Sequence, residues 1–189
     1  MGMDVHGLNP KQNRKLEEFP VFHKYKTMEE QDKDDIDDDN WEGFKKKWEE
    51  LDANQELKQQ YFSESDDYEK ANPGYYFRSN VWWWRPLWDF CYQFTGGIIS
   101  EELWGKGHHN SGHGLDAEGA KKLGYELMRL IGDGTAMRHE EQYNIAMEKR
   151  KKEAKIIGKD DFSTHYPFDT RKVEEFAIFC IESGGFEIC

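Results

Sequence analysis

Residues 74–88 read Gly-Tyr-Tyr-Phe-Arg-Ser-Asn-Val-Trp-Trp-Trp-Arg-Pro-Leu-Trp and hold four of the chain's seven tryptophans. Because each aromatic side chain can bury roughly 150–250 Å², this stretch predicts the centre of the hydrophobic core. We expect residues 75–84 to be extended, and Pro86 to lie in the first turn of a helix over residues 87–94. In a strand, Trp82 and Trp84 would face one side of a sheet and Trp83 the other.

The tripeptide Asn72-Pro73-Gly74 is a strong chain break and marks the main predicted boundary. Residues 1–73 are expected to form an N-terminal strand and an acidic, largely helical insertion, since 11 Lys/Arg against 20 Asp/Glu give this part a net charge of −9. Residues 74–189 are expected to form an aromatic-rich α+β core, in which 15 Lys/Arg against 18 Asp/Glu give −3.

Several helix starts are visible after the boundary. Ser100, Asp116 and Asp169 each precede a segment with helical apolar spacing and are expected to be N-caps. A long charged helix is expected to start at Thr135. Residues 186–189 predict a closing strand that pairs with a strand at residues 3–6. The predicted fold class is α+β: a helix-rich single domain with a small sheet of short strands and an aromatic core.

The insertion has weaker signals. Pro20 limits residues 19–25 to an edge strand, and residues 27–30 read as a capping box for a short helix. Six aspartates in residues 32–39 predict a solvated loop. Trp41, Phe44, Trp48 and Leu51 recur at helical spacing, which predicts one amphipathic helix over residues 41–61.

Composition limits the class of protein. A formal net charge of −12 repels polyphosphate at long range, so duplex nucleic acid is not an expected partner. The three cysteines show no paired spacing, which favours a reducing compartment. Neither a signal peptide nor an apolar run long enough for a bilayer is present. We therefore expect a cytoplasmic protein that does not associate with membranes.

The aromatic stretch has two interpretations. The rings either fill the core, or one face forms a platform on which a base stacks while nearby arginines hold phosphate. Packing in the core is the preferred interpretation, because buried aromatic rings dominate core energetics. Two arginines so close to the tryptophans keep the second interpretation open. The candidate ligand-binding residues from this stretch are Arg78, Asn80, Trp82, Trp84 and Arg85.

A second candidate is the glycine-rich loop over residues 105–114. Its histidines could bind a metal, hold phosphate together with a lysine and loop amides, or belong to a polar structural loop. No His-Glu-x-x-His motif is present, and we predict neither a metal ligand nor a cofactor. The candidate ligand-binding residues from the loop are Lys106, His108, His109, Asn110 and His113.

A calcium loop is a third, weaker candidate. Asp38, Asn40, Glu42, Gly43 and Glu49 nearly fit the EF-hand spacing. Three lysines at positions 45–47 place positive charge inside this loop. A solvated acidic linker is therefore the preferred interpretation of the segment.

Four pieces of the chain resemble an uncharacterised family of small tailed-phage and prophage proteins. These are residues 74–88, the opening Met-Gly-Met-Asp-Val, the loop Asn-Ser-Gly-His-Gly-Leu-Asp-Ala (110–117), and a C-terminal part that contains Tyr-Pro-Phe-Asp, Glu-Glu-Phe-Ala and Ser-Gly-Gly-Phe-Glu-Ile-Cys. Residues 10–70 lie outside the resemblance. Many relatives carry paired Cys-x-x-Cys elements between the last two helices, where residues 148–163 of this chain have no cysteine. The resemblance therefore implies that a zinc knuckle is not essential to the shared fold. The resemblance implies phage origin and no particular activity.

Taken together, these features favour a phage accessory protein that binds and sequesters a small nucleotide-derived molecule, such as a host immune signal, without cleaving it. One alternative is a histidine-dependent phosphodiesterase or nucleotide hydrolase, with or without a metal. Another is an inhibitor that docks on a host protein through the acidic insertion. The sequence also allows a homo-oligomer, because an exposed aromatic strand face tends to be covered.

Overall fold

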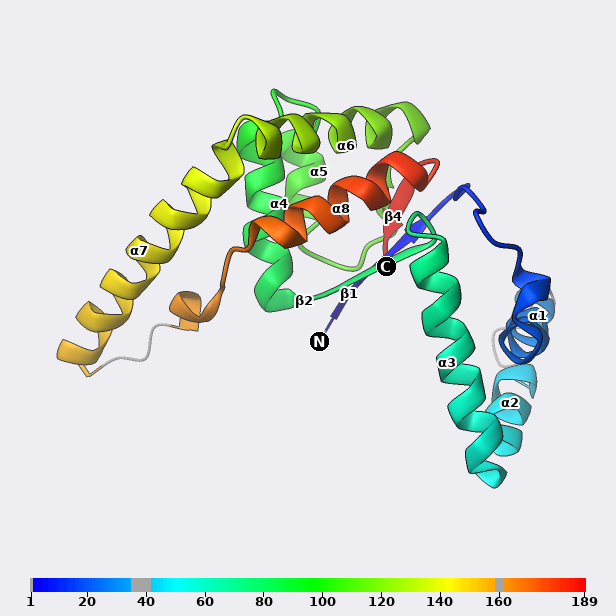
Figure 1. Ribbon diagram of the computed structural model, residues 1–189. Coiled ribbons are helices and arrows are strands. Elements are labelled where there is room, and N and C mark those ends of the chain that lie inside the picture. The colour runs from blue at the N-terminus through cyan, green and yellow to red at the C-terminus, as the bar shows by residue number, and fades with distance from the viewer. Residues whose placement is uncertain (1, 35–41, 159–161) are drawn as a thin grey trace. The chain divides into compact units, whose positions relative to one another are not determined.

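The computed structural model describes residues 2–34, 42–158 and 162–189 (Figure 1). The chain divides into two compact units, which we call the core unit (residues 1–11 and 73–189) and the insert unit (residues 12–72). The fold is α+β and rich in helix, as the sequence predicts. In the part of the chain described, no helix is long and apolar enough to cross a membrane.

The core unit contains a four-stranded antiparallel sheet in the order β2-β1-β4-β3. The strands are β1 (Gly2–Gly7), β2 (Tyr76–Asn80), β3 (His113–Leu115) and β4 (Phe186–Ile188). The expected pairing of the two terminal strands is confirmed, with Val5 opposite Ile188. Alternate residues on β1 and β2 are buried, among them Met3, Val5 and Phe77. One face of the sheet therefore belongs to the core, and the other carries polar side chains.

The helices of the core unit are α4 (Val81–Phe94), α5 (Glu101–Lys106), α6 (Ala117–Gly132), α7 (Thr135–Ile156) and α8 (Thr170–Glu182). Helices α6 and α8 pack closely side by side, and together with α4 they supply most of the core opposite the sheet (Figure 1). The predicted caps are confirmed: the side chains of Ser100, Asp116 and Asp169 each accept a backbone N–H from the first turn of the following helix.

The prediction of extended chain is right for β2 and wrong for residues 81–84, which form the first turn of α4. The physical reason is Asn80, whose side-chain oxygen accepts the backbone N–H groups of Trp82 and Trp83, both at 3.1 Å. Pro86 consequently lies inside the helix rather than in its first turn, at the loss of one helical hydrogen bond.

The insert unit is formed by α1 (Pro20–Asp34), α2 (Glu42–Ala53) and α3 (Gln55–Ala71). The edge strand predicted at residues 19–25 is wrong, because Pro20 takes the first position of a helix, where its missing N–H is not needed. The capping box at residues 27–30 is also wrong, since it lies within α1. The single helix predicted over residues 41–61 is interrupted at Asn54, which caps α3 by accepting the backbone N–H of Leu57.

The acidic loop and the calcium-like loop are both predictions for this unit. Residues 35–41, including Asp38 and Asn40, lie outside the described residues. The remaining positions of the calcium-like pattern, Glu42, Gly43 and Glu49, belong to helix α2.

Candidate functional site

Helix α4 has one partly exposed face that carries chemically active side chains. Trp82, Arg85 and Asp89 follow one another at spacings of three and four residues, so they lie along one side of the helix. Trp84 and Trp88 are on the buried side, and both are completely shielded from solvent. The cap at Asn80 sets where the helix begins and therefore which tryptophans face outward.

Trp82 and Arg85 meet Tyr166, which lies in the segment before α8. The rings of Trp82 and Tyr166 have centroids 4.8 Å apart and are tilted by 50°. The guanidinium of Arg85 donates a hydrogen bond to the Tyr166 hydroxyl at 2.9 Å. Arg85 itself is exposed. The result is an aromatic pair with a guanidinium beside it at the surface.

Asp89 is the centre of a second group on the same face. Its Oδ1 accepts the indole N–H of Trp104 at 2.7 Å and lies 3.3 Å from Nε2 of His108. Trp104 contacts His108 edge to face, with ring centroids 5.1 Å apart. Trp104 is also stacked on Tyr92. A carboxylate is thus held in place by an indole and in turn orients a partly buried imidazole.

The electrostatic influence of Asp89 extends to helix α7. The pKa of Tyr143 is raised by burial and, to a smaller extent, by the negative charge of Asp89. Burial alone lowers the pKa of His139, whose ring packs among aromatic side chains. Tyr143 therefore keeps its proton over the physiological range, and His139 stays neutral there.

We call this region the α4 surface. It combines two aromatic rings and a guanidinium at one end with a carboxylate–imidazole pair at the other. Its members are Trp82, Arg85, Asp89, Trp104, His108 and Tyr166.

Three residues predicted to bind ligand have other places in the structure. Trp84 is stacked on Trp88 with centroids 5.3 Å apart and donates its indole N–H to the carbonyl of Gly107 at 2.7 Å. Its ring is part of the core, so stacking of a base on Trp84 is not supported. Asn80 is occupied as a helix cap. Arg78 extends from the polar face of the sheet, 3.6 Å from Asp4.

The prediction of a loop over residues 105–114 is right only for residues 107–112, because residues 105–106 end α5 and residues 113–114 begin β3. The anion nest that was one interpretation of this glycine-rich segment is not formed by its amides. The backbone N–H groups of Ser111 and Gly112 both donate to the carbonyl of Ile188, at 3.0 and 2.8 Å. Because these amides are already paired with strand β4, they do not point at a shared ligand position. These hydrogen bonds instead hold the segment against strand β4 of the sheet.

Side chains of the same loop have separate partners. Lys106 pairs with Glu102 at 2.7 Å, and Asn110 donates to a backbone carbonyl of β1 at 3.4 Å. Nδ1 of His113 lies 2.7 Å from a carbonyl oxygen two residues earlier, and His109 is exposed. Of the five loop candidates, only His108 joins the α4 surface. Within the described residues no group of three or more His, Cys, Asp or Glu is placed to hold a metal ion.

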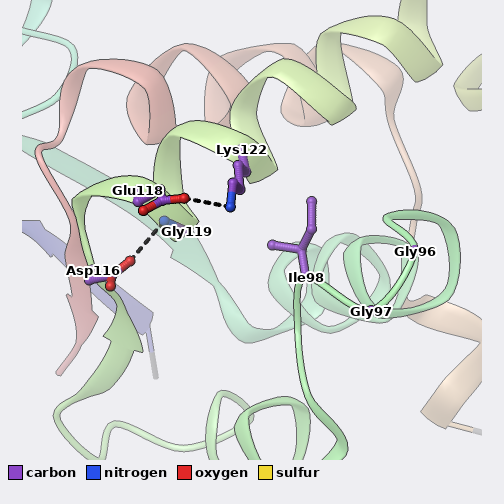
Figure 2. Close-up of a pocket in the computed structure, with 7 residues that line it drawn as sticks. All are labelled: Gly96, Gly97, Ile98, Asp116, Glu118, Gly119 and Lys122. Carbon is purple, nitrogen blue, oxygen red and sulfur yellow. Dashed lines mark hydrogen bonds and ion pairs between the residues drawn. The ribbon is translucent and has the colours of Figure 1, made fainter.

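An open hollow of about 450 Å³ lies at the start of α6 (Figure 2). Its charged side chains already have partners: Asp116 accepts the backbone N–H of Gly119 at 2.8 Å, and Lys122 contacts Glu118 at 2.6 Å. The hollow is lined by Gly96, Gly97, Ile98, Asp116, Glu118, Gly119 and Lys122. Because its charged side chains already have partners, we place the candidate site at the α4 surface.

Sequence reasoning missed Asp89, Trp104 and Tyr166. Helical spacing would have placed Asp89 beside Trp82 and Arg85 if residues 81–94 had been treated as one helix. No local pattern marks Trp104 or Tyr166, because their partners are distant in the chain; Arg85 and Tyr166 are 81 positions apart. No protein family, curated protein or solved structure matches the chain at a significant level.

Proposed function

We propose that the protein binds a small nucleotide-derived molecule at the α4 surface and holds it without cleaving it. The observation that carries this proposal is the partly exposed Trp82 ring against Tyr166, with the exposed Arg85 guanidinium bonded to the tyrosine hydroxyl. Stacking of a base on an aromatic ring contributes about 1–3 kcal/mol. A guanidinium has five N–H donors, so Arg85 retains donors for a phosphate while it bonds Tyr166.

Charge limits the kind of ligand. Arg85 is the permanently charged cation among the six residues of the α4 surface, and Asp89 contributes a negative charge to the same face. A chain with net charge −12 also repels polyanions at long range. These facts favour a ligand with one phosphate group, or a cyclic or ester-linked phosphate, over a nucleoside triphosphate. Removal of a host nucleotide signal is the role that the implied phage origin would give to such a protein.

Binding is tested by isothermal titration with a panel of mononucleotides and cyclic nucleotides. We expect Trp82→Ala and Arg85→Ala each to weaken affinity at least about tenfold, since 1.4 kcal/mol corresponds to a factor of ten. Arg129→Ala is the matched control, because Arg129 is exposed on α6 and pairs with Glu126 and Asp133. Unchanged affinity in the two α4 variants would refute the proposal.

The variant Arg78→Ala tests whether the ligand-binding site is confined to the α4 surface or extends to the sheet. Arg78 lies on the polar face of the sheet, whereas Arg85 lies on α4. If the α4 surface is the whole site, Arg78→Ala leaves affinity unchanged. A loss equal to that of Arg85→Ala would mean that the bound ligand also reaches the sheet.

The Asp89–His108 pair favours hydrolysis of a phosphate ester as a second candidate function. An imidazole oriented by a fixed carboxylate is the arrangement of a general base. His108 would take a proton from water as the water oxygen bonds to phosphorus. The ester P–O bond would break, and the same proton would pass to the leaving oxygen.

The two candidates are distinguished by the fate of the ligand. Chromatography of a nucleotide incubated with the protein recovers it intact if the protein only binds. Under the hydrolytic alternative, product accumulates, and His108→Ala and Asp89→Asn abolish its formation while Arg129→Ala does not.

A further inference from the structure

The outward face of helix α7 carries exposed isoleucines and lysines at a regular spacing. Ile145, Lys149, Lys152 and Ile156 are separated by four, three and four residues. Ile145 and Ile156 are 63% and 84% exposed. This spacing is that of the seam along which two helices pair in a coiled coil. We call these four residues the α7 stripe.

The opposite side of α7 faces the rest of the core unit. At 3.6 residues per turn, Ala154 lies half a turn away from Ile145 in projection, and Ala136 lies on the same side as Ala154. Both alanines are buried. The attachment of α7 therefore leaves the α7 stripe facing solvent along its length, about 16 Å at 1.5 Å per residue.

The α7 stripe lies in the most basic part of an acidic chain. Residues 145–157 contain five Lys/Arg and two Glu, a net charge of +3, although the whole chain has −12. Among the described residues, Lys149 has one long ion pair, to Glu153 at 3.9 Å. The neighbouring Arg150, Lys151, Lys152 and Lys155 form none with the described part of the chain.

Some lysines elsewhere in the core unit are instead closely paired with carboxylates. Lys106 and Lys122, for example, each contact a glutamate one turn away, at 2.7 and 2.6 Å. Ion pairs of that kind satisfy a charge within its own helix. The end of α7 instead presents basic groups that no carboxylate of the described residues holds closely, beside two isoleucines. This makes it the part of the core unit best suited to an anionic partner.

Pairing of α7 with the α7 helix of a second copy is disfavoured by its own charges. Lys149 and Lys152 occupy the two inner positions of the α7 stripe, so two copies would bring like charges together on the seam. Phosphate backbones of nucleic acid would use the lysines but not Ile145 and Ile156. The apolar ends and basic centre together match a helix with apolar ends and an acidic centre.

We propose that the α7 stripe binds an amphipathic helix of another protein, with carboxylates opposite Lys149 and Lys152 and apolar side chains opposite Ile145 and Ile156. Such a partner would supply opposite charge on the seam and cover both isoleucines. This contact is separate from the α4 surface and does not depend on ligand binding there.

The full-length protein is tested with two labelled synthetic helices of three heptads. Both carry leucine at the outer seam positions; one has glutamate and the other lysine at the inner positions. Fluorescence anisotropy is expected to show binding of the glutamate peptide at least about tenfold tighter than that of the lysine peptide. In Lys149→Glu/Lys152→Glu, the preference is expected to reverse.

Two further variants serve as controls for the peptide-binding measurement. Lys45→Glu/Lys46→Glu makes the same change in net charge at exposed positions of α2 and is expected to retain the original preference. Ile156→Ser is expected to weaken binding of the glutamate peptide without reversing the preference. Circular dichroism confirms that each variant is folded, which the exposure of these side chains favours.

Several outcomes would overturn the proposal. These are no measurable binding of either peptide, equal binding of both, or an unchanged preference in Lys149→Glu/Lys152→Glu. Binding of vesicles containing phosphatidylserine, lost in the same double variant while neither peptide binds, would assign the α7 stripe to a lipid surface instead.

Discussion

The core unit and the insert unit both depend on aromatic side chains, but they satisfy them differently. In the core unit, Trp84 and Trp88 are stacked and fully buried, and their indole N–H groups donate to backbone carbonyls. In the insert unit, the hydroxyl of Tyr25 donates to Glu50, and that of Tyr61 accepts from the buried Lys47. A large aromatic side chain can therefore be buried in two ways: its ring packs against other apolar groups, or its polar atom forms a hydrogen bond with a charged side chain.

This difference has a consequence for stability. The core unit is held chiefly by buried apolar area, which contributes roughly 25 cal/mol per Å². The insert unit has a net charge of −9, from 10 Lys/Arg and 19 Asp/Glu in residues 12–72, and two of its buried rings, Tyr25 and Tyr61, are hydrogen-bonded to charged side chains. Substitutions that remove apolar volume should damage the first unit most, and substitutions that remove charge should damage the second.

The largest effect is expected for Trp84→Ala. Removal of a buried indole leaves a cavity beside Trp88 and an unpaired carbonyl at Gly107, and such changes typically cost about 3–5 kcal/mol. Trp82→Ala, on the partly exposed face of the same helix, should cost about 1 kcal/mol or less. Urea denaturation followed by circular dichroism measures both. Equal losses in the two variants would contradict the assignment of Trp84 to the core and Trp82 to the surface.

A smaller effect is expected for Lys47→Ala in the insert unit. Nζ of Lys47 lies 2.7 Å from both Glu29 Oε1 and the Tyr61 hydroxyl, and its side chain is only 3% exposed. Its loss leaves the buried Tyr61 hydroxyl without this donor, at a cost of about 1–3 kcal/mol. Glu29 is partly exposed, so water compensates that side of the contact.

The variant Lys47→Met removes the charge of this side chain but keeps most of its volume. Methionine keeps most of the apolar stem of Lys47 but lacks the ammonium group, which lies 4.3 Å from the centroid of the Tyr61 ring. If the ionic contact stabilises the insert unit, Lys47→Met should lose nearly as much protection of α2 amides from hydrogen exchange as Lys47→Ala. Full protection in the methionine variant would show that this unit, like the core unit, depends on apolar packing alone.

The sequence predicts those parts of the fold that have local causes. Ser100, Asp116 and Asp169 are recognisable as caps because each helix start is encoded within four residues. Pro20 and Asn80 mislead, because aromatic and branched residues fit a strand as well as a buried helix. There a proline at the first helical position and an asparagine cap decide in favour of the helix.

The candidate site is harder to predict than the fold. The sequence points to Trp82, Arg85 and His108, but not to their partners Tyr166, Asp89 and Trp104. Contacts between α4, α5 and the segment before α8 depend on how these elements pack, and a single sequence carries no periodic signal for that. The same limit applies to the glycine-rich loop, whose amides bond strand β4 although nothing in its sequence indicates that partner.

The smallest predicted effect is a dependence of the core unit on mildly acidic pH. His139 packs against Phe90, Phe94, Tyr143 and Phe168, and burial lowers its pKa below the ordinary value of 6.5. The unfolded chain therefore binds a proton at a higher pH than the folded chain does. The contribution of the neutral His139 to the free energy of unfolding is fully present above pH 6.5. It is lost as the pH falls towards the lower pKa that His139 has in the folded chain.

In the insert unit, Glu50 has the corresponding role at a lower pH. Hydrogen bonds from Lys24 and Tyr25 lower its pKa below 4.5, so its contribution is present above pH 4.5 and is lost only on stronger acidification. Hydrogen exchange between about pH 7 and pH 5 should therefore show weaker protection in α4 and α7 before α2 and α3 respond. His139→Phe, which keeps an aromatic ring at this position, should remove the early response of the core unit. If the response persists in that variant, a group other than His139 is its source, and burial of this imidazole does not explain the difference in pH dependence between the two units.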